Sequence, residues 1–280
     1  MEGWQYLSAL LAGFLAARLV CGPCLSLLRA AGCMHPNYLG QEIPLGGGIV
    51  FFFSFLLLSV PALLISAGGF YGERLLPFLF LTAVSTLVGI MDDVWGSRSV
   101  SGLKGHFGRL FRGEITTGAL KAIAIGISSL VIFLPGGGLY DGLLNAALVA
   151  LWVNAINLFD LRPGRAGKVF LLTAILLTAA VWGSPEIILL GATAGALLAF
   201  LPVDLQARAM MGDAGANTLG AVIGLTVSWT LGSEAKLGVL LALLFLHLLT
   251  ERYSLTRIIA HNRVLDFLDR LGRGGGTQRN

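Results

Sequence analysis

Charged residues are scarce in this chain, because Asp, Glu, Lys and Arg make up only 12% of its 280 residues. Soluble globular domains carry about 25% charged residues, so this composition argues against a soluble domain. No long polar segment separates the apolar stretches, and we therefore expect no soluble appendage. Hydrophobic residues account for 56% of the sequence, a balance that is typical of a protein embedded in a bilayer.

Cysteine is also rare, with three residues near the N-terminus: Cys21, Cys24 and Cys33. The run CGPC at 21–24 matches the redox dithiol of thioredoxins, but that motif requires a strand followed by a helix. Here it lies near the end of a hydrophobic segment, on the side that we assign below to the cytoplasm, where thiols stay reduced. We interpret it as an ordinary helix end.

Apolar runs of about twenty residues, the length needed to cross the hydrocarbon core, repeat along the chain. Nine segments are predicted to be helices: 4–30, 45–68, 76–91, 117–135, 140–158, 168–183, 185–202, 217–232 and 235–250. The first lacks the basic region of a signal peptide, so we expect it to be retained. The sequence predicts an all-α polytopic membrane protein with about nine to ten transmembrane helices.

Lysine and arginine are distributed unevenly between the loops. Arg74 and Lys236 lie in one set of alternate loops, whereas most other basic residues lie in the opposite set or in the C-terminal segment. The positive-inside rule places the second set in the cytoplasm. We therefore predict a multi-pass protein of the cell membrane with its N-terminus outside and its C-terminus inside. The net charge of +4 is then a sign of topology, and we expect no nucleic-acid partner.

The pattern changes after residue 250. In ERYSLTRIIAHNRVLDFLDRLGR the apolar residues could form one face of a helix, with Arg257, Arg263 and Arg270 elsewhere. Such a helix is typical of segments that lie on a membrane surface. We predict two regions: a transmembrane domain over 1–250, and a cytoplasmic amphipathic helix with a flexible basic tail over 251–280.

Four aspartates gather at predicted helix ends on the predicted cytoplasmic side. Asp92 and Asp93 lie in GIMDDVWG, Asp160 ends NAINLFD, and Asp213 lies in MMGDAGANTLG. Charges at the edge of a membrane domain are costly and usually functional. Adjacent carboxylates repel each other unless a cation lies between them, and hard oxygen ligands of this kind suit Mg²⁺ that is completed by substrate phosphates. We take these four acids as catalytic candidates.

Further polar residues surround these acids in the sequence. Asn154 and Asn157 share one helical face with Asp160, and this face meets either a polar cavity or a packed partner helix. Asp213 lies in a glycine turn before a helix, where N–H groups favour a phosphate, although it could equally be a simple N-cap. Lys104, in the basic loop SGLKGHFGRLFRG, is a candidate phosphate contact.

These motifs occur in an order that resembles a known superfamily. DDVWG, GLKGH, NAINLFD, MGDAGANTLG and HPNYLGQEIPLGGGIVF, within about residues 30–225, are similar to segments of the polyprenyl-phosphate N-acetylhexosamine-1-phosphate transferases. The resemblance implies an integral membrane enzyme that transfers a sugar-1-phosphate from a UDP-sugar to undecaprenyl phosphate and releases UMP. It also implies Mg²⁺ as cofactor, with Mn²⁺ as an alternative.

The resemblance further implies roles for individual residues. Asp213 and Asn157 would be metal ligands, and Asp92 and Asp93 would serve the lipid phosphate and the metal. Asp160 would line the nucleotide or sugar-phosphate site. The implied partners are a polyprenyl phosphate, a nucleotide-sugar and the membrane, and we also consider a homodimer.

The loop after Asp160 departs from the family pattern. Where the family has a second acid, this chain has Pro163, flanked by Arg162 and Arg165 and followed by Lys168. Guanidinium groups match phosphate and carboxylate oxygens, so the three basic residues are candidate substrate contacts. The loop could bind a more acidic substrate, replace metal charge at the diphosphate, or anchor the helix end to anionic lipid.

The family's histidine-rich loop is also missing, and a lone His261 remains as a candidate substrate contact. Two functions stay open: an active phosphoglycosyltransferase that initiates a cell-envelope glycan, and a non-catalytic relative that binds polyprenyl phosphate or a nucleotide-linked ligand as a scaffold or regulator. Retention of the acids favours an altered substrate over lost activity. Transport of a lipid-linked intermediate lacks the internal inverted repeat that would support it.

Overall fold

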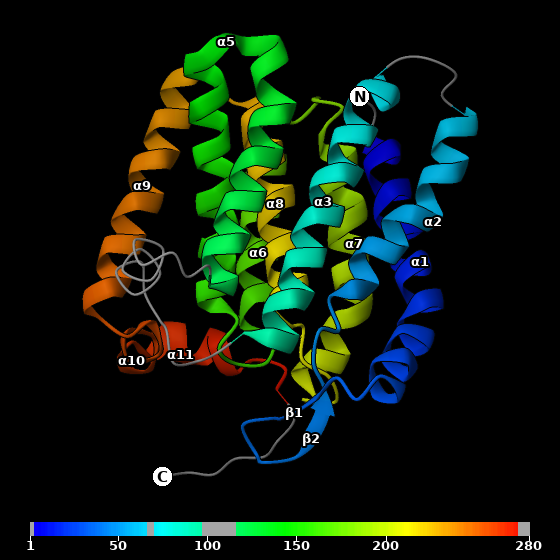
Figure 1. Ribbon diagram of the computed structural model, residues 1–280, viewed down its shortest axis with the longest axis vertical. Helices are drawn as coiled ribbons and strands as arrows, with labels where there is room; N and C mark the ends of the chain where they lie inside the picture. The colour runs from blue at the N-terminus through cyan, green and yellow to red at the C-terminus, as the bar shows by residue number, and fades with distance from the viewer. Residues whose placement is uncertain (1–2, 66–69, 97–115, 274–280) are drawn as a thin grey trace.

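The computed structural model describes residues 3–65, 70–96 and 116–273 as a bundle of helices (Figure 1). The helices are α1 (Gly3–Ala30), α2 (Ile49–Ile65), α3 (Phe70–Trp95), α5 (Thr117–Phe159), α6 (Arg165–Ala180), α7 (Ile187–Leu205), α8 (Gly212–Thr230), α9 (Ser233–Arg252), α10 (Leu255–His261) and α11 (Arg263–Arg270). Two short strands, β1 (Met34–Pro36) and β2 (Glu42–Pro44), pair in antiparallel register. The sequence analysis did not predict this hairpin.

Each of the nine predicted segments overlaps a helix, and two of them are the halves of α5. The halves meet at Gly138, whose φ of 74° is a left-handed conformation that glycine adopts at little cost. Figure 1 shows them side by side and joined at one end of the bundle. The break follows from the GGG run after Pro135, which supports a turn rather than a continuous helix.

Six segments in the described part of the chain are long and apolar enough to cross a membrane: α1, α3, both halves of α5, α7 and α9. Helix α2 is apolar but shorter. The prediction of an all-α polytopic membrane protein therefore agrees with the structure, while the count of nine to ten spans stays a prediction. Helix α1 also continues through Cys21 and Cys24, so the strand-to-helix setting of a redox dithiol is absent from this segment.

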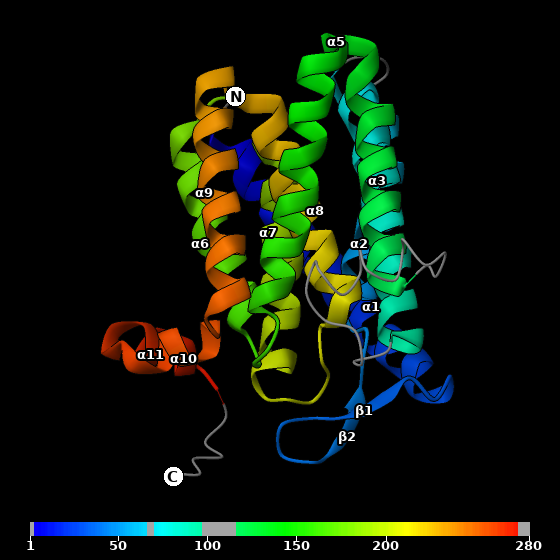
Figure 2. The same ribbon diagram turned by 60° about the vertical axis from the view of Figure 1, so that its left-hand side comes forward.

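The C-terminal segment, which the sequence predicts as an amphipathic helix, is helical in two short pieces, α10 and α11, that meet at Asn262. The Asn262 side-chain oxygen accepts hydrogen bonds from the backbone N–H groups of Val264 and Leu265, at 3.0 and 3.1 Å. An asparagine in this position is a strong N-cap, and it therefore ends α10 and starts α11. Figure 2 shows both helices lying across the end of α9.

Helix α8 lies in the interior of the bundle and is buried along most of its length. Small residues allow the neighbouring backbones to approach it closely, as is common in membrane helices. A Cβ built on Gly48, just before α2, would lie 2.0 Å from the Gly215 Cα, and one on Gly89 of α3 would lie 2.5 Å from the Ala214 Cα. The first turn of α8 is therefore fixed between α2 and α3.

Gly48→Ala is expected to destabilise the protein, because the added methyl group meets backbone atoms that cannot rotate away. Overpacking of this kind costs about 1–3 kcal/mol. Gly126→Ala in α5 is the matched control, since no atom lies within 4 Å of its added Cβ. Thermal midpoints in detergent measure both changes, and equal midpoints for the two variants would show that the close approach is not required.

Candidate functional site

A pocket of about 840 Å³ opens where α3 and α7 end, α8 begins and the β1–β2 hairpin approaches the bundle. Seven of the predicted site residues line it: Asp92, Asp93, Asn154, Asn157, Asp160, Arg162 and Asp213. These residues are far apart in the sequence. They meet because α3, both halves of α5 and α8 have ends at this level of the bundle (Figure 2). The structure thus brings the acids together, as the sequence analysis expected.

The Asp213 carboxylate is the centre of a polar cluster in this pocket. Its Oδ2 accepts hydrogen bonds from the Lys121 Nζ at 2.5 Å and from the Asn157 Nδ2 at 3.0 Å. The same ammonium group lies 3.2 Å from the Asp92 Oδ2. A single lysine therefore bridges two carboxylates from different helices, whereas from the sequence we expected a cation between the adjacent Asp92 and Asp93.

Asp93 has a different role from its neighbour Asp92. Its Oδ1 and Oδ2 accept hydrogen bonds from the backbone N–H groups of Asp213 at 2.9 Å and Ala214 at 3.2 Å. A carboxylate at this position satisfies unpaired donors and complements the helix dipole. A Cβ on Gly212 would lie 2.5 Å from the Asp93 Oδ2, so this cap requires a glycine there. Two N–H groups at the helix start, where we expected a phosphate, are occupied by Asp93.

Asp160 follows the last turn of α5 and lies on the pocket wall. Burial raises the pKa of Asp160 well above its ordinary value, and the nearby charges of Asp204, Asp213 and Asp93 raise it further. A positively charged ligand in the pocket would relieve this repulsion. The side chain is thus suited to contact a bound cation or to donate a proton to an anionic ligand.

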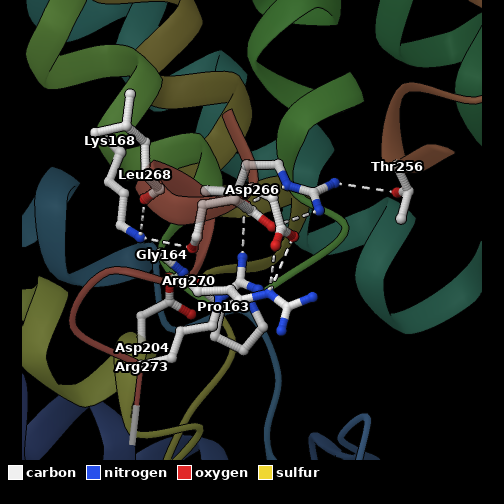
Figure 3. A network of polar contacts seen from close by, with 11 residues as sticks. Pro163, Gly164, Lys168, Asp204, Thr256, Asp266, Leu268, Arg270 and Arg273 are labelled. Atoms are coloured by element: carbon white, nitrogen blue, oxygen red, sulfur yellow. Dashed lines mark hydrogen bonds and ion pairs between the residues drawn. The ribbon is translucent and has the colours of Figure 1, made fainter. Parts of the chain in front are cut away.

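The structure does not bring Arg165 or Lys168 to the pocket lining. The Arg165 guanidinium group is buried and pairs with Asp269 of α11, with Nε–Oδ1 and Nη2–Oδ2 distances of 2.7 and 2.9 Å. The Lys168 Nζ donates hydrogen bonds to the carbonyl oxygens of Leu268 and Asp269 at 2.9 and 2.7 Å. Both residues therefore contact the C-terminal helices. Figure 3 shows Lys168 beside Leu268, where the lysine complements the carbonyl end of α11.

Two other predicted substrate contacts also need comment. His261 is exposed at the end of α10, and its Nδ1 lies 2.8 Å from the Arg257 carbonyl oxygen. It does not line the pocket. Lys104 belongs to residues 97–115, outside the described residues, so its proposed phosphate contact stays a prediction.

The sequence analysis missed two residues of this site, Lys121 and Asp204. Lys121 is an isolated cation within the apolar segment 117–135, and the argument from the cost of charge in a membrane applied to it as well as to the acids. Asp204 is buried in the last turn of α7, and its Oδ2 accepts a hydrogen bond from the Gly164 N–H at 2.8 Å. It orients the loop that follows Asp160.

The donors in the pocket suit a metal that is only partly bound by protein. Among the described residues, no group of three or more His, Cys, Asp or Glu side chains is arranged to hold a metal ion. Asp92 and Asp213 nevertheless offer carboxylate oxygens beside the Asn157 amide. One or two carboxylates with substrate phosphates are the ligands that Mg²⁺ commonly uses, so the oxygen donors fit that ion once a phosphate is bound.

Comparison with known proteins places the chain in a family. Residues 75–230, more than half of the chain, match the family described as glycosyl transferase family 4. The chain is also 29% identical over 189 residues to the decaprenyl-phosphate N-acetylglucosaminephosphotransferase of Mycobacterium leprae. That alignment covers 60% of this chain and 45% of the relative, so the chain spans about half the relative's length. The matched region contains the acids and Lys121, and the chain belongs to glycosyl transferase family 4.

Proposed function

We propose that this protein transfers a sugar-1-phosphate from a UDP-sugar to a polyprenyl phosphate such as undecaprenyl phosphate, and thereby initiates a cell-envelope glycan. Family membership supports this proposal, as does the name of the relative, which combines a polyprenyl phosphate with N-acetylglucosamine phosphate. The observation that supports it most directly is the convergence of Asp92, Lys121, Asn157 and Asp213 in one pocket at the end of an apolar bundle.

The reaction joins two phosphates. An oxygen of the lipid phosphate attacks the phosphorus that bears the sugar, a new P–O bond forms, and the P–O bond to the nucleotide breaks. UMP leaves with the electron pair, and the products are UMP and a polyprenyl diphosphate sugar. Phosphoryl transfer requires mainly positioning and neutralisation of charge. Lys121 supplies a fixed positive charge at the acid cluster.

Mg²⁺ would neutralise the diphosphate charge when bound, and Asp213, Asp92 and Asn157 are the residues that we propose would hold it. Asp93 has a separate task, because it fixes the first turn of α8 and so sets the position of Asp213. Asp160 lies on the wall of the same pocket, where burial raises its pKa, so it holds a proton more readily than an exposed aspartate. Mn²⁺ is an alternative ion for the same oxygen donors.

Arg162 lies in the loop after Asp160, and we propose that it contacts the nucleotide-sugar. It lines the pocket, and its guanidinium carbon lies 6.0 Å from the centre of the Tyr38 ring in the β1–β2 hairpin. Such stacking orients an arginine for contact with an anion. This placement favours an acidic or phosphate-bearing ligand for Arg162 over an anchor to membrane lipid.

We also propose that the pocket faces the cytoplasm, in line with the positive-inside rule. Helices α10 and α11 lie at the end of the bundle where α8 begins (Figure 2), and Gly212 and Asp213 at the start of α8 line the pocket. Arg74 is one of the two basic residues that we predicted to lie outside. It pairs with Glu186, just before α7, at the opposite end of the bundle from the pocket. This topology places the C-terminal helices inside and the start of α1 outside.

Release of UMP by the purified protein in detergent tests the proposed function. The assay combines undecaprenyl phosphate, Mg²⁺ and a panel of UDP-sugars, and we expect release that depends on the lipid and stops when EDTA removes the metal. Parallel assays without lipid separate transfer from hydrolysis of the donor. Retained binding of lipid phosphate without UMP release for any donor would favour the non-catalytic relative.

A further inference from the structure

The C-terminal helices are tied to the loop 160–164, which joins α5 to α6 and forms part of the pocket wall. Figure 3 shows a network of ion pairs and hydrogen bonds between this loop, α6, α7, α11 and Arg273. None of these contacts includes the acid cluster around Lys121. The network therefore needs an explanation of its own.

The centre of the network is the pair formed by Arg165 and Asp269. Only 4% and 9% of these two residues are exposed, and two parallel hydrogen bonds join them. Paired contacts between a guanidinium and a carboxylate fix both distance and orientation. The Arg165 Nη1 also donates to the Thr256 hydroxyl of α10 at 3.1 Å. Arg165 thus fixes both C-terminal helices to the start of α6.

The loop itself is held from two sides. Arg273 donates from its Nε to the Pro163 carbonyl oxygen at 2.9 Å and from its Nη2 to the Asp269 Oδ1 at 2.6 Å. On the other side the Gly164 N–H donates to the Asp204 carboxylate of α7. Gly164 has φ of +74°, and a Cβ there would lie 2.3 Å from the Leu205 Cδ2. The loop therefore lies clamped between α7 and the C-terminal segment.

We propose that Asp269 and Arg273 are positioning residues for the transfer reaction. By holding Arg165 and the Pro163 carbonyl, they keep the loop 160–164 in the conformation in which Asp160 and Arg162 line the pocket. Neither residue touches the substrate in this proposal, which rests on the proposed function for its effect on catalysis. Arg165, one of the two arginines that flank Pro163, thus has a structural partner within the same chain.

A second acid on α11 shows why the clamp differs from an ordinary surface pair. Asp266 pairs with Arg270 four residues later, with side-chain exposures of 29% and 66%, and exposed pairs of this kind contribute little. Asp269, in contrast, is buried, and burial alone would raise its pKa. Hydrogen bonds from Arg165 and the charge of Arg273 outweigh that effect and lower the pKa of Asp269 below its ordinary value, so it remains charged in its pair.

Comparison of Asp269→Asn with Asp266→Asn tests the proposal in the full-length protein. Hydrogen exchange of the loop 160–164, which reports local opening, is expected to accelerate in Asp269→Asn and to stay unchanged in Asp266→Asn. In the UMP assay we expect kcat/KM for the UDP-sugar to fall by about 10- to 100-fold in Asp269→Asn alone. Asp269→Glu, which keeps the charge, is expected to recover part of the loss.

The outcomes separate this proposal from the proposed function. If the wild-type protein releases no UMP, the function fails, and hydrogen exchange still decides whether the clamp holds the loop. Wild-type exchange and wild-type kcat/KM in Asp269→Asn would overturn the proposal. If Asp269→Asn does not fold, Arg273→Gln replaces it, because this change removes the contact with Pro163 and leaves the Arg165–Asp269 pair intact. An unchanged loop in Arg273→Gln would then overturn it.

Discussion

Asp213→Asn is expected to reduce UMP release by about 100- to 1,000-fold. The substitution keeps the size of the side chain and an oxygen that can accept from Lys121, so the fold should persist. It removes the negative charge that pairs with the Lys121 ammonium and that we propose binds the metal. Rates of UMP release at saturating substrates, measured with the thermal midpoint, separate lost chemistry from lost folding.

The control for Asp213→Asn is Asp141→Asn. Asp141 lies just after the Gly138 break in α5, at the other end of the bundle from the pocket. We expect Asp141→Asn to retain wild-type turnover. Full turnover by a folded Asp213→Asn variant would exclude this acid cluster as the catalytic centre and would leave the proposed function without its main support.

Lys121→Met is expected to affect both stability and activity. Lys121 is 11% exposed in its side chain and bridges Asp92 and Asp213, so its loss leaves two neighbouring carboxylates without a counterion. Removal of one partner from a buried ion pair costs about 3–5 kcal/mol, and the partial exposure of the acids places the expected value near 3 kcal/mol. Methionine keeps the length of the apolar stem, so the change is mainly one of charge.

Thermal midpoints with and without Mg²⁺ provide a readout of Lys121→Met that does not depend on turnover. We expect added Mg²⁺ to raise the midpoint of Lys121→Met more than that of the wild type, because the ion can take the place of the ammonium between the carboxylates. Lys236→Met, at the start of α9, is the matched control and should respond like the wild type. Identical midpoints for the wild type and Lys121→Met would contradict the buried bridge.

Much of the fold could be predicted from the sequence because membrane helices leave a strong apolar signal. The predicted segments 117–135 and 140–158 lie on either side of the glycines that form the break in α5. The β1–β2 hairpin has only three residues in each strand, too few for a recognisable alternation. The break between α10 and α11 depends on Asn262, which caps the start of α11. The apolar pattern of the segment runs through this position and does not indicate the break.

The candidate site was predictable as a gathering of acids, but the tasks of the individual acids were not. Successive residues on a helix point about 100° apart, so Asp92 and Asp93 face different neighbours even though they are adjacent in the sequence. Only the packing of α8 and α5 beside α3 shows that Asp93 caps α8 while Asp92 meets Lys121 of α5. Lys121 was not predicted because it lies within an apolar helical segment, whereas most cations of this chain lie in loops.

The contact between Arg165 and Asp269 had no local signal at all. The two residues are 104 positions apart, and each resembles the charged residues that commonly flank a membrane helix. An arginine near a phosphate-binding motif suggested a ligand contact, but its actual partner is a carboxylate of the same chain. Pairing over such a distance depends on where α9 ends and on how the last helices turn back, which periodicity does not reveal.

This separation along the chain also sets the order in which the pocket is assembled during biosynthesis. Protein chains emerge from the ribosome at about 5–20 residues per second, so Asp269 follows Arg165, 104 positions earlier, by roughly 5–20 s. Asp213 follows Arg165 by 48 positions, so all four acids have been made well before Asp269, while the loop beside them still lacks its anchor. The pocket wall is therefore completed only after the acids have been made, and a nascent chain that stops after α9 would present the acid cluster with an unsecured loop.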